Sequence, residues 1–219
     1  MHSNFVLHLP NEILTIIINE LALDNEGIDI DNDNDESLAA LASCRLASHV
    51  LCSLATPHFF SSISLTGIYK DGSIGGTSPF VERATKFNDI LATGNIAASI
   101  HSLTLHSCYQ TLKDSSSGAI MSAILSRLSH IQKFSLDVDY YVSFHSLSMD
   151  FAAAIQGLCR SPNLTTLYLD GILYFPFTTI RTSPNLRCLR LWRSGRLAVN
   201  LIFFSSFLWQ LTYYSSLTT

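Results

Sequence analysis

Apolar and polar positions alternate with a helical period in the first quarter of the chain. Between residues 11 and 22, apolar side chains recur at three- and four-residue steps, at Ile13, Leu14, Ile17, Ile18 and Leu21. This spacing predicts a strongly apolar helix with all five residues on one face, and Pro10 is compatible with its first turn. A second short helix is predicted to carry Leu38, Leu41 and Leu46 on one face. A third begins at Val50 and is expected to end at Thr56, before Pro57. Three helices this short cannot close a large core, so part of their apolar surface is expected to be covered by something else.

Further along the chain, four segments repeat an apolar-x-x-apolar-x-Leu pattern. They are Ile100–Leu105, Ile131–Leu136, Leu164–Leu169 and Leu186–Leu191, which start 31, 33 and 22 residues apart. The last two each follow a Ser-Pro-Asn tripeptide, and helix-like stretches separate the segments. This alternation of short strand and helix resembles a degenerate leucine-rich repeat, in which each unit buries its apolar edge only against its neighbours. A single α/β domain with leucine-rich strands is the alternative.

The period-two alternation within each predicted strand divides its side chains between two faces. It predicts inward side chains at Leu103, Leu105, Phe134, Leu136, Leu167, Leu169, Leu189 and Leu191. The residues between them then lie on the opposite, exposed face of the array. Because Tyr, Trp and Arg are enriched at binding hot spots, we expect substrate contact toward the C-terminal end of this face. The candidate substrate-binding residues are Tyr168, Asp170, Arg190 and Trp192.

Several short motifs in the first 65 residues occur together in one known domain. They are Leu9-Pro10, residues 12–14 (Glu-Ile-Leu), 44–48 (Cys-Arg-Leu-Ala-Ser), 55–60 (Ala-Thr-Pro-His-Phe-Phe) and 63–65 (Ile-Ser-Leu). In this order and spacing they resemble the F-box domain of the large fungal F-box receptor families. The resemblance implies docking onto a Skp-type adaptor, which joins the receptor to a cullin-RING ubiquitin ligase. The adaptor-binding residues that it implies are Leu9, Pro10, Ile13, Leu14, Ile17, Cys44 and Ser48.

Two positions depart from the family pattern. His49 and Leu51 stand where family members usually carry Arg and a large aromatic residue, and the insertion between the first two helices is long. An ordinary apolar helical hairpin is therefore one alternative for this region. An interaction scaffold unconnected to ubiquitin is the alternative for the whole chain.

The sequence divides into four parts. Residues 1–65 are predicted to form an all-helical F-box-like module, interrupted by an acidic loop at 24–36 that holds seven carboxylates. A glycine-rich linker at 66–78 leads into a leucine-rich-repeat-like domain at 79–196. A segment without any charge follows at 197–219. The predicted fold class is α+β, a small three-helix module followed by an α/β solenoid.

Composition and charge narrow the functional classes. Of 219 residues, 47% are hydrophobic and 14% charged, which is typical of a globular protein with a sizeable core. The 13 Lys and Arg residues form no run or stripe, so nucleic-acid binding is not expected. Five widely spaced cysteines without a CxxC motif, and an N-terminus without a secretory pattern, favour a reduced protein of the cytoplasm or nucleus.

The C-terminal segment at 197–219 is long enough to span a bilayer. Asn200, Gln210 and several hydroxyl residues interrupt its apolar run, which argues against a membrane anchor. A final repeat or a terminal segment that covers the end of the array fits this pattern better.

No catalytic motif is visible. The chain has no GxSxG, no HExxH and no phosphate-binding glycine loop. His101, His106 and Cys108 lie close in sequence, but no second His/Cys pair completes a zinc site. We therefore expect no catalytic residue, no metal and no cofactor. The expected function is that of a non-catalytic receptor, which binds a Skp-type adaptor and cullin complex through its first part and an unidentified substrate protein through its second.

Overall fold

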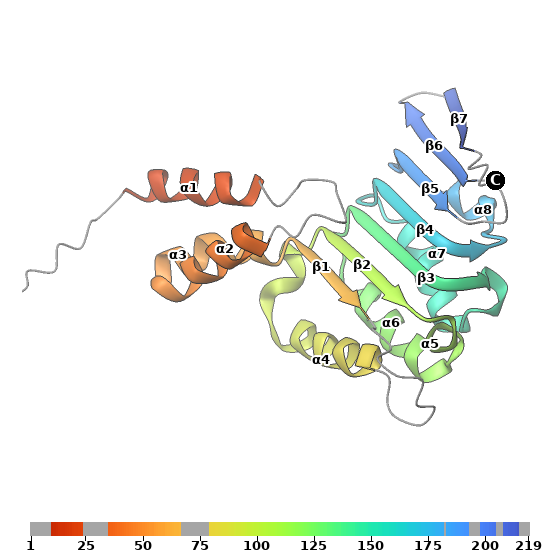
Figure 1. The fold of residues 1–219 in the computed structure, drawn as a ribbon, viewed down its shortest axis with the longest axis horizontal. Helices are drawn as coiled ribbons and strands as arrows, with labels where there is room; N and C mark the ends of the chain where they lie inside the picture. Colours follow the sequence, from red (N-terminus) through yellow and green to blue (C-terminus); the bar gives the residue numbers. More distant parts are fainter. Residues whose placement is uncertain are drawn as a thin grey trace, which may run out of the picture. The chain divides into compact units, whose positions relative to one another are not determined.

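A computed structural model describes residues 10–23, 35–66, 79–181, 183–192, 198–204 and 208–214. The chain divides into two compact units, Met1–Ser61 and Ser62–Thr219. The first unit is helical, and the second combines helices with a mainly parallel sheet (Figure 1). The fold is therefore mixed α/β, with the helical unit ahead of the sheet in the sequence.

The first unit contains the helices α1 (Asn11–Leu23), α2 (Asp35–Ala47) and α3 (His49–Phe59). Its centre is small, because among the residues described in this unit only Ile18, Leu41 and Ala55, one from each helix, are buried together. The partly buried side chains around them are Leu21, Cys44, Leu51, Leu54 and Phe59. A centre of this size removes little apolar area from water, so hydrophobic burial stabilises this unit less than the second one.

The predictions for α2 and α3 are each wrong in one detail. Leu38 and Leu46 do not share the buried face of Leu41, and they are 41% and 89% exposed. Leu46 lies five residues beyond Leu41, which is too far round the helix to reach the same face. The third helix does not end at Thr56 but continues through Pro57. Proline is tolerated there because it lies in the last turn and on the exposed side, where the carbonyl that loses its helical partner is not buried.

Side-chain contacts cap α3 at its start and connect its C-terminal end to α2. Ser48 is the N-cap of α3, and its hydroxyl accepts a hydrogen bond from the N–H of Leu51 at 3.1 Å. The Arg45 guanidinium lies 4.7 Å from the ring centroids of both Phe59 and Phe60. Its Nε also donates to the Thr56 hydroxyl at 3.2 Å. These contacts join the C-terminal ends of α2 and α3 through cation–π attraction and a hydrogen bond.

The structure moves two of the predicted boundaries. Helix α2 begins at Asp35, so the last two residues of the predicted acidic loop are helical, and residues 24–34 lie outside the described part. Strand β1 (Ser62–Thr66) pairs in parallel with β2 (Ser102–Ser107). The first unit therefore ends at Ser61 and not at residue 65. The physical reason is that Leu65, an apolar residue in an alternating stretch, is buried when β1 joins the sheet. Of the predicted linker, residues 67–78 lie outside the described part.

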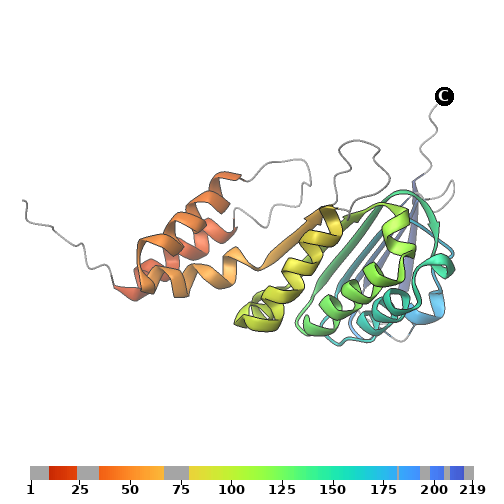
Figure 2. The same ribbon diagram turned by 90° about the horizontal axis from the view of Figure 1, so that it is seen from below.

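The strands of the second unit lie side by side in sequence order, from β1 to β7. The first five are parallel, and they continue from β2 with β3 (Lys133–Ser143), β4 (Thr166–Leu173) and β5 (Cys188–Trp192). The connections contain α4 (Pro79–Thr93), η1 (Asn95–Ser99), α5 (Tyr109–Lys113), α6 (Ser115–Arg127), η2 (Phe144–Ser146), α7 (Met149–Cys159) and α8 (Phe177–Ile180). Right-handed crossovers that all advance in one direction place their helices on one face of the sheet. Figure 2 shows this for α4, α6 and α7.

The predicted division of strand side chains between two faces is confirmed. All eight residues expected to face inward are at most 4% exposed. Helices α6 and α7 complete this core with Met121, Ile124, Phe151 and Ile155, each at most 1% exposed. On the opposite face lie the alternate, mostly polar residues of the strands, and no described helix of this unit covers them.

The two Ser-Pro-Asn tripeptides have the same structural role. Asn163 Nδ2 donates to the Ser129 carbonyl at 2.8 Å, and Asn185 Nδ2 donates to the Pro162 carbonyl at 2.7 Å. In both cases an asparagine joins the loop before one strand to the loop before the preceding strand. Main-chain N–H groups of residues 132, 165 and 187 make a matching series of bonds to the carbonyls of residues 101, 132 and 165. The repetition in the sequence is thus reflected in repeated contacts.

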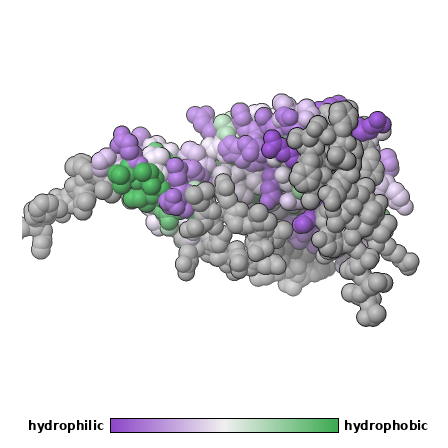
Figure 3. Space-filling model, turned by 90° about the horizontal axis from the view of Figure 1, so that it is seen from above, coloured by the Kyte–Doolittle hydropathy of each residue, from purple (hydrophilic) through white to green (hydrophobic). Residues whose placement is uncertain are grey.

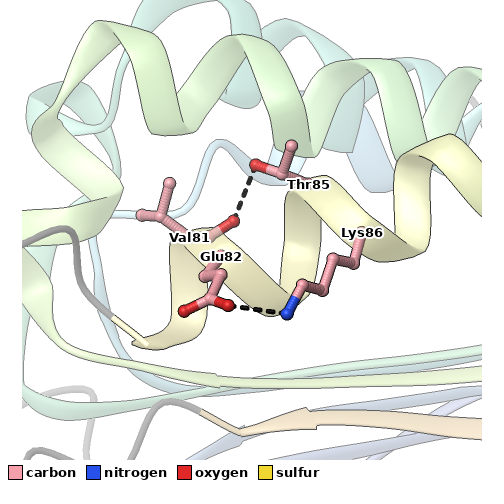
Figure 4. Close-up of polar contacts among 4 residues, drawn as sticks. All are labelled: Val81, Glu82, Thr85 and Lys86. Atoms are coloured by element: carbon pink, nitrogen blue, oxygen red, sulfur yellow. Dashed lines mark hydrogen bonds and ion pairs between the residues drawn. The ribbon is translucent and has the colours of Figure 1, made fainter.

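Helix α4 covers the β1 end of the sheet with an amphipathic face. Its buried residues are Phe80, Ala84, Phe87 and Leu91. Figure 4 shows its exposed side, where Lys86 Nζ lies 2.6 Å from Glu82 Oε1 and the Thr85 hydroxyl donates to the Val81 carbonyl at 2.8 Å. The hydrogen bond and the charge of Lys86 lower the pKa of the Glu82 carboxyl. Because both side chains are well exposed, this ion pair adds little to stability.

Strand β3 contains a bulge near its C-terminal end. Its pairing with β4 is regular over residues 133–137 and resumes at residue 142. Opposite the break, Gly171 has a φ of +75°, and a Cβ at this position would lie 2.6 Å from the Val138 carbonyl oxygen. Glycine therefore satisfies both the backbone conformation and the close approach of the bulge. The bulge leaves Asp139, Tyr140 and Tyr141 exposed.

Two strands lie within the segment predicted at 197–219. Strand β6 (Ala198–Phe204) pairs antiparallel with β5, and β7 (Leu208–Tyr214) pairs antiparallel with β6. They extend the sheet beyond β5 and cover the edge that β5 would otherwise present. Across the described ranges, no helix combines the length and the apolarity that crossing a bilayer requires.

Two helical glycines of the second unit are expected to respond in opposite ways to alanine. A Cβ at Gly118 in α6 would lie 2.5 Å from the Cβ of Ser148, the N-cap of α7, whereas a Cβ at Gly157 meets no heavy atom within 4 Å. Gly118→Ala should lower the free energy of unfolding by about 1–3 kcal/mol, because the cap must shift. Gly157→Ala should raise it by about 0.5–1 kcal/mol, because alanine favours the helix. Urea titrations followed by circular dichroism measure both changes, and equal midpoints for the two variants would contradict them.

Candidate interaction surfaces

Helix α1 has apolar side chains on its exposed side as well as on its buried side. Ile13, Ile16 and Ile17 are 42%, 56% and 44% exposed, and their three- and four-residue spacings make them neighbours on the helix surface. We call these three residues the α1 strip. Apolar surface gathers on the first unit, as Figure 3 shows. Single exposed apolar side chains are common, but a contiguous group on one short helix indicates an interaction site.

The residues implied by the F-box resemblance have different environments. Leu9 lies outside the described residues. Pro10, Ile13 and Ile17 are exposed and Leu14 is half-buried, so the structure brings these four together at the start of α1. Two others have structural contacts within the unit. Cys44 is half-buried against its core, and Ser48 is exposed and caps α3.

The open face of the sheet, which we define as the face without helices, is a second surface. The strand register places its residues in rows that run across the parallel strands. One row contains Ser64, Thr104, Ser135, Tyr168 and Arg190. The next row, nearer the C-terminal ends of the strands, contains Thr66, His106, Asp137, Asp170 and Trp192.

All four predicted substrate-binding residues lie in these two rows, on the adjacent strands β4 and β5. Arg190 and Trp192 are exposed, and Tyr168 and Asp170 are half-buried. The structure therefore brings these side chains together on the open face, although one carboxylate oxygen of Asp170, Oδ1, is buried there.

Tyr168 lies between two cations. Lys133 Nζ is 5.5 Å and Arg190 Cζ is 5.4 Å from the centroid of its ring, and the two residues come from the strands on either side. Burial, followed by the charge and the hydrogen bond of Cys188, raises the pKa of the Tyr168 hydroxyl. The neutral ring holds both cations by cation–π attraction and fixes positive charge at this part of the open face.

His106 lies between two carboxylates of the adjacent strand β3. Its Nδ1 is 2.8 Å from Asp137 Oδ2, and its Nε2 is 3.3 Å from Asp139 Oδ1. Each of the three side chains is between 35% and 42% exposed. Together with the register, these contacts show a polarised face. Carboxylates lie toward the C-terminal ends of the strands, and the cations beside Tyr168 lie toward the N-terminal ends.

Sequence patterns do not single out four exposed residues of these surfaces. Tyr140, Tyr141 and Tyr174 are 71%, 58% and 76% exposed near the C-terminal ends of β3 and β4, and Ile16 belongs to the α1 strip. Weak signals for three of them are present. Tyr140 and Tyr141 follow the point where the apolar–polar alternation of β3 ends. Three consecutive isoleucines, from Ile16 onward, cannot all face one side of a helix, so at least one of them points away from the core.

The metal-ligating and thiol side chains of the described residues bear on the question of a reactive site. Within the ranges that the structure describes, no group of three His, Cys, Asp or Glu side chains is placed to hold a metal ion. Burial raises the pKa of the Cys159 thiol to about 12, which leaves this cysteine unreactive at neutral pH. No protein-family model matches the chain, and no curated protein is detectably similar to it in sequence.

Proposed function

We propose that this chain is the substrate-recognition subunit of a cullin-RING ubiquitin ligase and has no catalytic role of its own. Its first unit docks a Skp-type adaptor, and its second unit holds a substrate protein in the cytoplasm or nucleus for ubiquitin transfer by a separate enzyme. The α1 strip supports this most strongly. Two of its three isoleucines, Ile13 and Ile17, belong to the residues that the F-box resemblance implies for adaptor binding.

The energetics of docking through the α1 strip are favourable. The residues that form the centre of the first unit, Ile18 and Leu41, stay buried during docking, because they lie on the other side of the helices. The three strip side chains are each about half exposed, and full burial of an isoleucine is worth about 1.5–3 kcal/mol. Covering the strip therefore offers roughly 2–4 kcal/mol, to which neighbouring exposed groups such as Pro10 add.

The second unit supports the receptor role by its architecture. Parallel strands in sequence order, helices on one face and repeated asparagine contacts are the features of a leucine-rich-repeat-like array. Such an array positions a bound protein on a rigid open face, and positioning is the contribution that a ligase receptor makes to transfer. Tyr168, Asp170, Arg190 and Trp192 are the proposed substrate contacts on this face.

Complex formation with a purified Skp-type adaptor tests the proposal. The intact chain and the adaptor are mixed at micromolar concentration and separated by size-exclusion chromatography with light scattering. The expected result is a complex with one copy of each protein. If the two proteins elute separately, the ubiquitin role is excluded, and an interaction scaffold unconnected to ubiquitin becomes the better account of the two surfaces.

A further inference from the structure

The C-terminal rim of the open face combines carboxylates with exposed aromatic rings. We define this rim by Asp137, Asp139, Tyr140, Tyr141 and Trp192. Asp137 and Trp192 belong to one row of the sheet, separated by a single position on β4. Their Cα atoms are therefore two strand spacings apart, roughly 10 Å. The other three residues project from the β3 bulge.

The two carboxylates and the bulge are held by contacts with the neighbouring strands. His106 lies within 2.8 Å of an Asp137 oxygen and 3.3 Å of an Asp139 oxygen, so it ties both carboxylates to β2. Gly171 on β4 accommodates the bulge, whose carbonyls at residues 138 and 140 approach it closely. The two carboxylates, fixed in this way, lose little conformational entropy when a ligand binds.

The rim is accessible and negatively charged. Tyr140, Tyr141 and Trp192 are 71%, 58% and 39% exposed. The cations of the open face, Lys133 and Arg190, occupy other rows and lie over Tyr168. A cationic side chain is attracted both by the carboxylates, through charge-assisted hydrogen bonds, and by the faces of the aromatic rings. Nucleic acids and anionic membranes are negatively charged, as the rim is, and the same carboxylates repel them.

We propose that the rim binds an extended protein segment that carries lysine or arginine side chains. The cationic group lies against Asp137 and Asp139, and its aliphatic stem packs on the neighbouring rings. This inference deepens the proposed function, because it names the chemical class of the substrate segment. It rests on that function only in calling the bound partner a substrate.

Peptide binding to the intact chain, without the adaptor, tests this inference. Three fluorescent peptides of equal length alternate serine with lysine, glutamine or glutamate, and fluorescence anisotropy measures their affinities. The lysine peptide is expected to bind at least about tenfold more tightly than the glutamine peptide, and to weaken as salt is added. The glutamate peptide is expected to bind most weakly of the three.

A double variant and a matched control separate the rim from general charge attraction. Asp137→Asn with Asp139→Asn keeps the size of both side chains and an oxygen atom on each beside His106, and should weaken binding of the lysine peptide about tenfold. Trp192→Ala should also weaken it. Asp89→Asn with Asp150→Asn removes the same charge from the exposed sides of α4 and α7, and should change the affinity by less than about twofold.

Three results would overturn the inference. They are equal losses in the two double variants, equal affinities for the lysine and glutamine peptides, and tighter binding of the glutamate peptide. Because the adaptor is absent from this assay, failure of the rim leaves adaptor docking unaffected. Conversely, loss of adaptor docking leaves peptide binding by the rim to be measured separately.

Discussion

Replacement of Ile13 and Ile17 by aspartate is expected to weaken binding of the chain to a Skp-type adaptor by at least about a thousandfold. In the proposed complex both positions would be buried against the adaptor, and a buried carboxylate without a partner costs several kcal/mol. In the free chain the same carboxylates face solvent, because the two isoleucines are 42% and 44% exposed. The first unit should therefore stay folded, and isothermal titration calorimetry should show the loss in affinity alone.

Asn11→Asp, compared with the single Ile13→Asp variant, is the matched control. Asn11 is exposed on the same helix, but it is not three or four residues from any member of the α1 strip, so it does not neighbour the strip on the helix surface. Its replacement adds the same charge to α1 and should leave adaptor affinity within about threefold of the original, because the charge remains in solvent. Equal losses for the two variants would show that charge on α1 matters and not the strip. Unchanged binding in Ile13→Asp would place the docking surface elsewhere.

Alanine at Gly171 is expected to destabilise the second unit by about 2–5 kcal/mol, which combines two independent costs. The backbone at this position has a φ of +75°, a conformation that costs a residue with a Cβ about 1–2 kcal/mol. The new Cβ would also lie 2.6 Å from the Val138 carbonyl and 3.3 Å from the Tyr140 carbonyl. Because these obstacles are backbone atoms, no side-chain rotation relieves them. Urea unfolding followed by circular dichroism should show a lower midpoint.

Gly171→Asn separates the two costs. Asparagine tolerates positive φ better than alanine but places the same Cβ against the bulge. If the collision dominates, the asparagine variant should be nearly as unstable as the alanine variant. A midpoint for Gly171→Ala equal to that of the unchanged chain would contradict this description of the bulge.

The faces of the parallel strands could be predicted from the sequence because a period-two pattern reports directly which side chains share a face. Leu103, Leu105 and their equivalents are buried as predicted, and Arg190 and Trp192 are exposed. The buried face of helix α1 was harder to predict, because three consecutive isoleucines are compatible with several choices of buried face. Ile13 and Ile18 were expected on one face, but packing of α2 and α3 buries Ile18 and leaves Ile13 exposed.

Features that depend on distant parts of the chain could not be predicted. The contacts of His106 with Asp137 and Asp139 require the register between β2 and β3, which local spacing does not determine. The role of Gly171 depends on a bulge in a different strand. The placement of residues 62–65 was wrong for a related reason. The stretch is too short for its alternation to reveal a strand, and only pairing with β2 shows that it belongs to the sheet.

Hydrogen–deuterium exchange of the intact chain, with and without a Skp-type adaptor, tests the central claim most directly. If α1 is the docking element, the adaptor should slow amide exchange across Asn11–Leu23, because docking suppresses local opening of a helix with a small core. Exchange in strands β2 to β5 should stay unchanged, which leaves the open face for a substrate. A complex in which the sheet is protected and α1 is not, or the absence of any complex, would contradict the account.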